Sequence, residues 1–256
     1  MKFDPKNPFP SVDPESISYE EVKAHAREFD AWLGLSLESV EAKVREALAT
    51  RARDEALAVS EAISDTSEMS ITREFWLSKP VDTFMTPYWD LDYMLRAAGL
   101  AASDLVVDLG AGYARLAFVL ALRHPDVGFV GIEKIEARIL EASRVFATNP
   151  LFRAAPRDQY QFLAEDLRET DLAKMSDPLS ENTIAVRERT HFLIYDFGSR
   201  EDIQAVLLKL QALARDQKVI VLARGGRSRE IIDRGHPWLS QVQPPQHFIR
   251  FSVYRS

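Results

Sequence analysis

The sequence contains no cysteine, which excludes disulfide bonds, thiol nucleophiles and thiolate metal ligands. It has no apolar run near the roughly 20 residues that a membrane-spanning helix requires. The first residues also lack the apolar core of a secretory signal. The five histidines are scattered and form no metal-ligand pair in the sequence. We therefore expect a cytoplasmic, metal-free protein that does not enter a membrane.

Basic charge is scarce as well. The net charge is −7, and residues 1–80 hold 16 of the acids but only 10 of the bases. An acidic chain without a long basic tract is poorly suited to binding the phosphates of duplex nucleic acid. The segment RGGRSRE at 224–230 is a local exception, which we interpret as an exposed, flexible, charged turn. Nucleic acid is therefore a less favoured partner than a protein or a small molecule.

The chain divides into two regions with different patterns. Residues 1–15 contain four prolines, and SYEE at 18–21 has the Ser-x-x-Glu form of a helix capping box. Apolar residues at helical spacing then predict two helices, the second reaching about residue 63. From about residue 81, strands alternate with helices, as in βαβ units. We predict an N-terminal arm and helical appendage at 1–80, which covers the pocket or binds a partner, and a doubly wound α/β domain at 81–256.

The strands of the second region are short apolar runs, which favours a mostly parallel sheet. We predict them at 104–109, 128–133, 160–166, 191–197, 218–224 and 247–255, with 238–242 as a partner of the last one.

The segment VVDLGAGYAR, residues 106–115, joins the first strand to a helix through two glycines. Gly110 and Gly112 let the chain turn tightly and approach a ligand without an intervening Cβ. Ligands of open α/β sheets bind at this edge, and the first amides of the next helix suit a carboxylate. Asp108 ends the strand, so it favours a ligand carrying an ammonium or sulfonium group and disfavours a pyrophosphate. S-Adenosyl-L-methionine has all of these groups, and we expect it as the cofactor.

Three more acids end the next three predicted strands. Glu133 stands 21 positions after Gly112, where an acid accepts hydrogen bonds from ribose hydroxyls. We expect Asp166 to accept from the adenine amino group and Asp196 to lie nearest the place of methyl delivery. One acid at a strand end is often only a turn former. Four in succession, beside a glycine turn, favour a binding site.

Residues 81–256 resemble the class I S-adenosylmethionine-dependent methyltransferases. VDLGAGYAR is similar to their first motif, Asp/Glu-x-Gly-x-Gly-x-Gly, with Ala114 in place of the third glycine. From this departure we expect slight crowding without loss of binding. GIEK, EDL and IYDF occupy later motif positions. The resemblance implies a Rossmann-like, seven-stranded sheet with an antiparallel last strand, and it adds Tyr113, Lys134 and Leu167 to the cofactor-binding residues.

A weaker resemblance is to the seven-strand protein lysine methyltransferases. It is carried by TPYWDLDYMLRAAGL at 86–100 and by GIEKIEARILEAS at 131–143. In that family a Thr-Pro or similar segment helps to cover the cofactor, and Thr86, Pro87 and Tyr88 match it. The resemblance implies protein methylation, with a lysine amine as the acceptor.

Asp196 is our candidate for the group that receives the proton of such an amine. The alternative, equally weighted, is that it only caps the next helix near Ser199. Tyr88, with Trp89, is a candidate wall of the substrate pocket, although two aromatic residues before a helix are more often core.

Other functions stay open. A methyltransferase could act on a small molecule or RNA, and the chain could be a non-catalytic cofactor-binding module. A nicotinamide-dependent reductase is disfavoured, because Arg115 stands where the dinucleotide fingerprint requires its last glycine.

Overall fold

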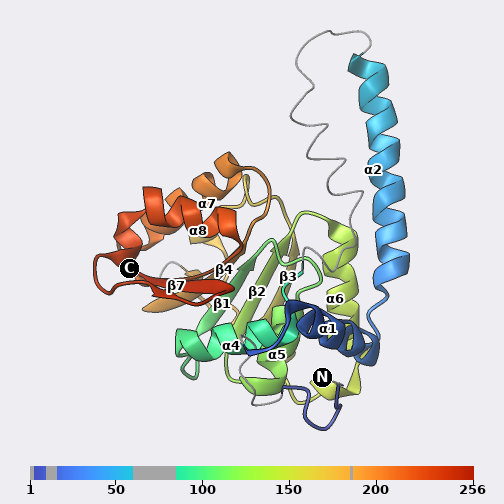
Figure 1. Ribbon diagram of the computed structural model, residues 1–256. Coiled ribbons are helices and arrows are strands. Elements are labelled where there is room, and N and C mark those ends of the chain that lie inside the picture. Colours follow the sequence, from blue (N-terminus) through green and yellow to red (C-terminus); the bar gives the residue numbers. More distant parts are fainter. Residues whose placement is uncertain (1–2, 10–15, 60–84, 185–186) are drawn as a thin grey trace.

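The computed structural model describes residues 3–9, 16–59, 85–184 and 187–256, without the side chains of 51–59. The predicted division near residue 80 lies outside the described residues and stays a prediction. The structure has a single sheet of short strands covered by helices on both faces (Figure 1). The strands are β1 Leu105–Leu109, β2 Gly128–Glu133, β3 Tyr160–Ala164, β4 Arg189–Tyr195, β5 Lys218–Arg224, β6 Gln246–His247 and β7 Phe251–Arg255. The α-helices are α1 Tyr19–Leu33, α2 Leu37–Val59, α4 Tyr88–Ala98, α5 Arg115–Arg123, α6 Glu136–Thr148, α7 Arg200–Leu213 and α8 Gly226–Gly235.

The sheet has seven strands in the order β3-β2-β1-β4-β5-β7-β6. Strands β1 to β5 are parallel, whereas β7 runs antiparallel between β5 and β6. The predicted fold class is confirmed: the protein has a doubly wound α/β fold with an antiparallel last strand. The strand order reverses between β1 and β4, and this switch point is where open α/β sheets bind their ligands.

Alternate residues of each strand enter different cores. In β1, Val106 packs with residues of α4, α5 and α6, while Leu105 and Val107 pack with residues of α7 and α8 on the other face. Burial of both faces explains why the parallel strands are continuous apolar runs in the sequence. Asp108 lies two positions after Val106 in the strand, so its side chain points to the same face of the sheet, that of α4 and α5.

The first helix begins where its capping box predicts. The Ser18 hydroxyl accepts from the Glu21 amide, and the Glu21 carboxylate accepts from the Ser18 amide in return. Its buried residues, among them Phe29 and Leu33, join the same apolar core as α4 and α5. Phe29 stacks on Tyr88 with ring centroids 4.1 Å apart. Helix α1 therefore completes one face of the domain.

Helix α2 follows and extends beyond the α/β core (Figure 1). The structure describes it as far as Val59, and the predicted limit near residue 63 lies outside the described residues.

The C-terminal region differs from the prediction in two places. Residues Pro237–Ser240 form a turn of 3₁₀-helix instead of a strand, because Trp238 and Leu239 are buried against the α7 face. The predicted long last strand is a hairpin, in which β6 pairs with β7. The basic segment at 224–230 is not a flexible turn either, since α8 begins at Gly226.

Candidate active site

The glycine turn after β1 has the backbone geometry that its glycines allow. Gly110 and Gly112 have φ angles of +83° and +56°, values that residues with a Cβ rarely adopt. The amides of Gly110 and Ala111 donate to the carbonyl of Ile132, over 2.9 and 2.8 Å, so the turn is fastened to β2. A Cβ placed on Gly112 would meet no atom within 4 Å, which means that open space adjoins the turn.

Ala114, which stands at the position of the motif's third glycine, also adopts a left-handed conformation, with φ +46°. Its side chain is completely buried, at the start of α5. The departure from the motif therefore produces backbone strain, while the slight crowding that the sequence predicts stays a prediction.

Glu133 joins the end of β2 to this turn. One carboxylate oxygen accepts from the Gly112 amide and the other from the Ile135 amide, each over 2.8 Å. The predicted ribose-binding acid thus also holds the turn in shape. Each carboxylate oxygen has a second lone pair, so the same group can still accept from ligand hydroxyls.

Asp108 is the most unusual acid of the site. Its side chain is buried, and no hydrogen bond from a described residue contributes to its electrostatics. Burial, and then the negative charge of Glu133, raise the pKa of the Asp108 carboxyl to about 8. A cation placed beside it would favour the ionised form and lower this value.

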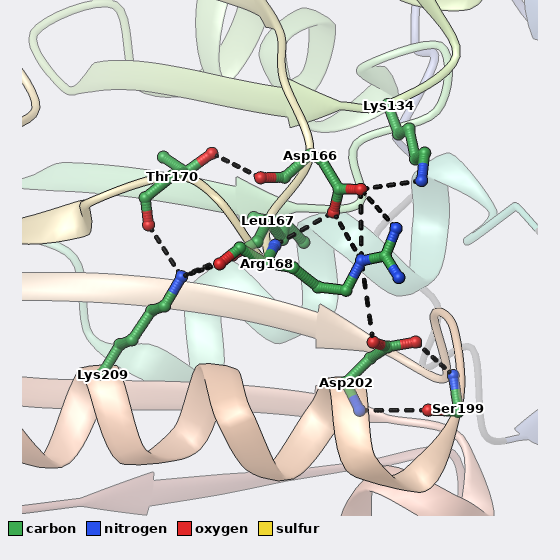
Figure 2. Close-up of polar contacts among 8 residues, drawn as sticks. All are labelled: Lys134, Asp166, Leu167, Arg168, Thr170, Ser199, Asp202 and Lys209. Atoms are coloured by element: carbon green, nitrogen blue, oxygen red, sulfur yellow. Dashed lines mark hydrogen bonds and ion pairs between the residues drawn. The ribbon is translucent and has the colours of Figure 1, made fainter.

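Asp166 and Lys134 lie together, but they pair with each other. The Lys134 ammonium donates to Asp166 over 2.7 Å, and the Arg168 guanidinium approaches the same carboxylate, also at 2.7 Å (Figure 2). Hydrogen bonds from Arg168, and next from Lys134, hold the pKa of Asp166 well below its usual range. An adenine amino group would therefore share this carboxylate with two cations.

The loop after β3 is held by Lys209 of α7. Its ammonium donates to the carbonyls of Leu167, Arg168 and Thr170 at 2.7 to 2.9 Å (Figure 2). The Leu167 side chain is buried in the core on the α7 face. Leu167 thus anchors the loop, and only its backbone remains available to a ligand.

Thr86 and Tyr88 are held by the same buried network. The Tyr88 hydroxyl donates to Asp30 over 2.7 Å, and Arg115 donates to Asp30 and to the Thr86 carbonyl. Tyr88 is completely buried, as is Trp89 beside it. Burial, and next the charge of Asp30, raise the pKa of the Tyr88 hydroxyl well above its usual value of about 10. This environment suits a core residue, so we leave Tyr88 out of the proposed catalytic groups.

Tyr113 connects the glycine turn to α2. Its hydroxyl donates to Glu41 of α2 over 2.9 Å, and Arg138 of α6 pairs with the same carboxylate at 2.7 Å. Tyr113 also packs with Val40 and Val44 of α2. The first turns of α2 therefore lie over the residues that follow the glycines.

Asp196 caps a helix, although not the predicted one. Its carboxylate accepts from the amides of Arg227 and Ser228 at the start of α8. Ser199 caps α7 by a box of its own with Asp202. Asp196 is only half-buried, and a Cβ on Gly225 would lie 2.3 Å from its carboxyl carbon, so β4 and β5 end in close contact here.

Two buried arginines were not predicted as site residues. Arg115 pairs with Asp30, and Arg224 pairs with Asp90 over 3.0 Å. A charged residue ending the apolar strand KVIVLAR is the one sequence signal that pointed to Arg224.

The opposite edge of the sheet contains a cleft of about 990 Å³, lined by Asp104, Arg187 and Arg189 among others. Its charges pair within the cleft: Arg189 and the buried His191 both contact Asp104. The cleft faces the amino ends of the strands, away from the glycine turn. In the described part of the chain no group of histidines and acids is arranged to hold a metal, and no helix is long and apolar enough to cross a membrane.

Comparisons with known proteins were made for the family, for curated relatives and for solved structures. No family model and no curated protein matches the chain. Solved structures that are similar include the mitomycin 7-O-methyltransferase MmcR, with 12% identity, a TM-score of 0.43, and coverage of 65% of this chain and 52% of that one. The O-methyltransferase NcsB1 of neocarzinostatin biosynthesis, in complex with S-adenosylmethionine, gives 15% identity, a TM-score of 0.48, and coverage of 73% and 59%.

A third similar structure is a putative RNA methyltransferase, PH1948 from Pyrococcus horikoshii, with 16% identity, a TM-score of 0.44, and coverage of 80% of this chain and 94% of that one. This chain spans about half the length of the first structures it matches. At these identities and TM-scores the similarities carry no argument about activity or substrate. The fold therefore stands on the strand order: this is a seven-stranded, Rossmann-like α/β protein.

Proposed function

We propose that this protein is an S-adenosylmethionine-dependent methyltransferase. The observation that carries the proposal is Asp108, a buried carboxyl group beside Glu133 whose pKa is perturbed by burial and by Glu133 and by no hydrogen bond from a described residue. Two neighbouring acids in a low-dielectric site disfavour an anionic ligand and favour a cationic one. The open space beside Gly112 allows a ligand to approach the turn between them.

The residues at this edge suit the separate parts of the cofactor. Asp108 would face its cationic groups, and Glu133 would accept from the ribose hydroxyls while it keeps its bonds to the turn. Lys134, Asp166 and Leu167, in the loops that follow β2 and β3, would adjoin the adenine, with Asp166 already ion-paired. Gly110, Gly112 and the amides at the start of α5 would adjoin the carboxylate.

When bound, the cofactor supplies an electrophilic methyl group. The protein has to align the acceptor with this group, and alignment can contribute about 7–11 kcal/mol to such a reaction. Asp196 lies at the end of β4, beside the switch point, and one of its oxygens has only a 3.3 Å bond to a backbone amide. We assign it the role of receiving the acceptor's proton.

The acceptor class also remains a proposal. A protein lysine, a small molecule and RNA are all compatible with the cofactor site, which is shared by enzymes of many substrates. We keep the cytoplasm as the expected location.

Calorimetry with S-adenosylmethionine and with a nicotinamide dinucleotide tests the cofactor. We expect the first to bind and the second not to bind. Asp108→Ala and Glu133→Ala should each weaken binding at least tenfold, or about 1.4 kcal/mol, whereas the exposed Glu136→Ala should leave it unchanged. Binding of the dinucleotide alone would reject the proposal.

Transfer is tested by incubating the protein with labelled donor and a cell lysate. Label that a protease destroys indicates a protein acceptor, and label that a nuclease destroys indicates RNA. Binding without transfer under any condition would identify a cofactor-binding module instead of an enzyme.

A further inference from the structure

Arg224 is the last residue of β5, directly beside the proposed reaction site. It pairs in the sheet with Tyr195, the residue before Asp196, and the next residue, Gly225, touches the Asp196 carboxylate. Its side chain is only 4% exposed. Arg224 alternates with Leu222 along β5 and therefore lies on the face of α4 and α5, which is also the face of Asp108.

The charges around Arg224 do not balance. Asp90, itself 2% exposed, accepts from Arg224 over 3.0 Å and from Arg250 over 2.9 Å. Among the described residues no second acid pairs with either arginine. The cluster therefore carries an excess positive charge, which is costly in a buried place unless an anion compensates it.

Arg224 also has donors without acceptors. Its Nη2 donates to Asp90 and to the Tyr19 hydroxyl, but Nε and Nη1 are buried and make no hydrogen bond. The rings of Tyr195 and Tyr19 lie 4.9 and 5.5 Å from the guanidinium. Ring faces attract the positive charge, but they do not replace the oxygen acceptors that buried N–H groups require.

Arg115 shows that this is not the ordinary state of a buried arginine in this protein. It is equally buried, at 4% exposed, and it also pairs with one acid. Yet each of its three nitrogens has an acceptor, on Asp30 or on the Thr86 carbonyl. Arg115 is thus satisfied by the protein itself, whereas Arg224 is not.

We propose that Arg224, flanked by Arg250 and Tyr19, binds an oxyanion of the methyl acceptor, either a carboxylate or a phosphate. This inference rests on the proposed function, since the position of Arg224 at the end of β5, on the face of Asp108, is what makes the anion part of the acceptor. Tyr19 and Tyr195, whose rings adjoin the guanidinium, are themselves only half-buried. The acceptor is then an acidic molecule, and an unmodified lysine in a basic peptide segment is excluded because it would add a cation to this cluster.

The anion site is tested with the full chain and two probes, acetate and inorganic phosphate, each titrated against chloride at constant ionic strength. The thermal midpoint should rise with one of them in the wild-type protein, and the better probe distinguishes a carboxylate from a phosphate. Arg224→Gln should weaken the apparent affinity at least tenfold. The exposed Arg234→Gln, a matched loss of charge, should leave it unchanged.

Arg250→Gln is a second variant, needed because Arg224→Gln could disturb the fold. It keeps the pair of Arg224 with Asp90 but removes the excess charge, and it should weaken anion binding at least threefold. Circular dichroism checks that both variants are folded. No stabilisation of the wild-type protein, or equal stabilisation of the folded Arg224→Gln protein, would overturn the site.

The link to the acceptor is tested with labelled donor and lysate. The labelled product should be retained by an anion exchanger at pH 7 and should be lost with Arg224→Gln, whereas calorimetry should show unchanged cofactor affinity. Labelled product that passes through the exchanger would overturn the inference and leave the methyltransferase proposal intact. Failure of the wild-type protein to bind S-adenosylmethionine would instead reject the proposed function, while the salt titrations would still decide the anion site.

Discussion

Ser228 donates two hydrogen bonds to a single oxygen of Asp196, one from its amide over 2.7 Å and one from its hydroxyl over 2.8 Å. Asp196 therefore combines two roles, as a cap of α8 and as the proposed proton acceptor. Because both bonds use the same oxygen, Oδ1, the two roles are separable by mutation.

Asp196→Asn should keep the Oδ1 acceptor and lose the proton acceptor. We expect turnover to fall at least tenfold while the affinity for S-adenosylmethionine changes less than threefold, as measured by methyl transfer and calorimetry. Ser228→Ala is the control, since it removes one bond to the cap, at a cost of about 1 kcal/mol, and should retain turnover. If Ser228→Ala lowers turnover as much as Asp196→Asn does, Asp196 acts through α8 and not on the acceptor.

The raised pKa of Asp108 predicts how cofactor binding depends on pH. With a pKa of about 8 the carboxyl is largely protonated at neutral pH, and a cationic ligand binds the ionised form. The affinity for S-adenosylmethionine should therefore increase up to tenfold per pH unit as pH rises towards 8, and should level off above it. Calorimetry in buffers of different ionisation enthalpy should detect release of about one proton at pH 7. A pH-independent affinity in the wild-type protein would contradict the assignment.

The same group makes the ligand-free protein less stable as pH rises. The folded-state pKa of Asp108 lies above its unfolded value, so its contribution to stability is full below about pH 4 and is lost as pH increases through 8. Asp108→Asn cannot ionise, and its melting temperature should exceed that of the wild-type protein increasingly between pH 4 and pH 8. Thermal scans across this range measure the difference, and a constant gap would show that Asp108 does not titrate there.

The left-handed conformation of Ala114 predicts an unusual mutational effect. Replacement by glycine removes about 1–2 kcal/mol of backbone strain, which offsets the lost methyl burial of about 0.8 kcal/mol and the backbone entropy of glycine. Ala114→Gly should therefore change the free energy of unfolding by less than about 0.5 kcal/mol. Ala117→Gly, equally buried but within α5, should lose about 1.5–2 kcal/mol. Equal losses in urea denaturation would contradict the strain.

The hydrogen bond between Glu41 of α2 and Tyr113 leads us to predict that α2 controls the residence time of the cofactor. The Glu41 carboxylate accepts from Tyr113, the residue after Gly112, and from Arg138 of α6. Glu41→Ala should speed hydrogen exchange in the first turns of α2 and increase the dissociation rate of S-adenosylmethionine at least threefold, in stopped-flow measurements. Glu38→Ala, exposed on the same helix, is the control and should change neither quantity.

The sheet was predictable because parallel strands are buried on both faces. The predicted bounds of β2 and β5 coincide with the structure, since these strands are apolar between their end residues. Their neighbours β3 and β4 end before Asp166 and Asp196, which lie in the following loops. The apolar pattern of the sequence shows where a buried segment ends. The hydrogen-bonded pairing of β3 and β4 ends one or two residues earlier, where the backbone turns away from the sheet.

The chemistry of the site was less predictable, because hydrogen bonds between distant segments have no sequence period. Nothing around Asp166 in the sequence indicates that Lys134, 32 positions away, takes one of its oxygens. The basic segment was mistaken for a flexible turn because its glycines and arginines conceal the start of α8. Tyr88 was grouped with the pocket, and its partner Asp30 lies 58 positions away.

The stack of Phe29 on Tyr88 and the neighbouring Asp30–Arg115 ion pair have a practical consequence for N-terminal truncation of the protein. A fragment that begins at Met85 would lack Asp30 and Phe29. The Arg115 guanidinium would then have no carboxylate partner and the Tyr88 ring would be exposed to water, which favours aggregation. N-terminal deletions should therefore not extend past Ser16, and an affinity tag should replace only residues before it. Any foreign N-terminal segment fused to this protein would have to supply its own carboxylate for Arg115.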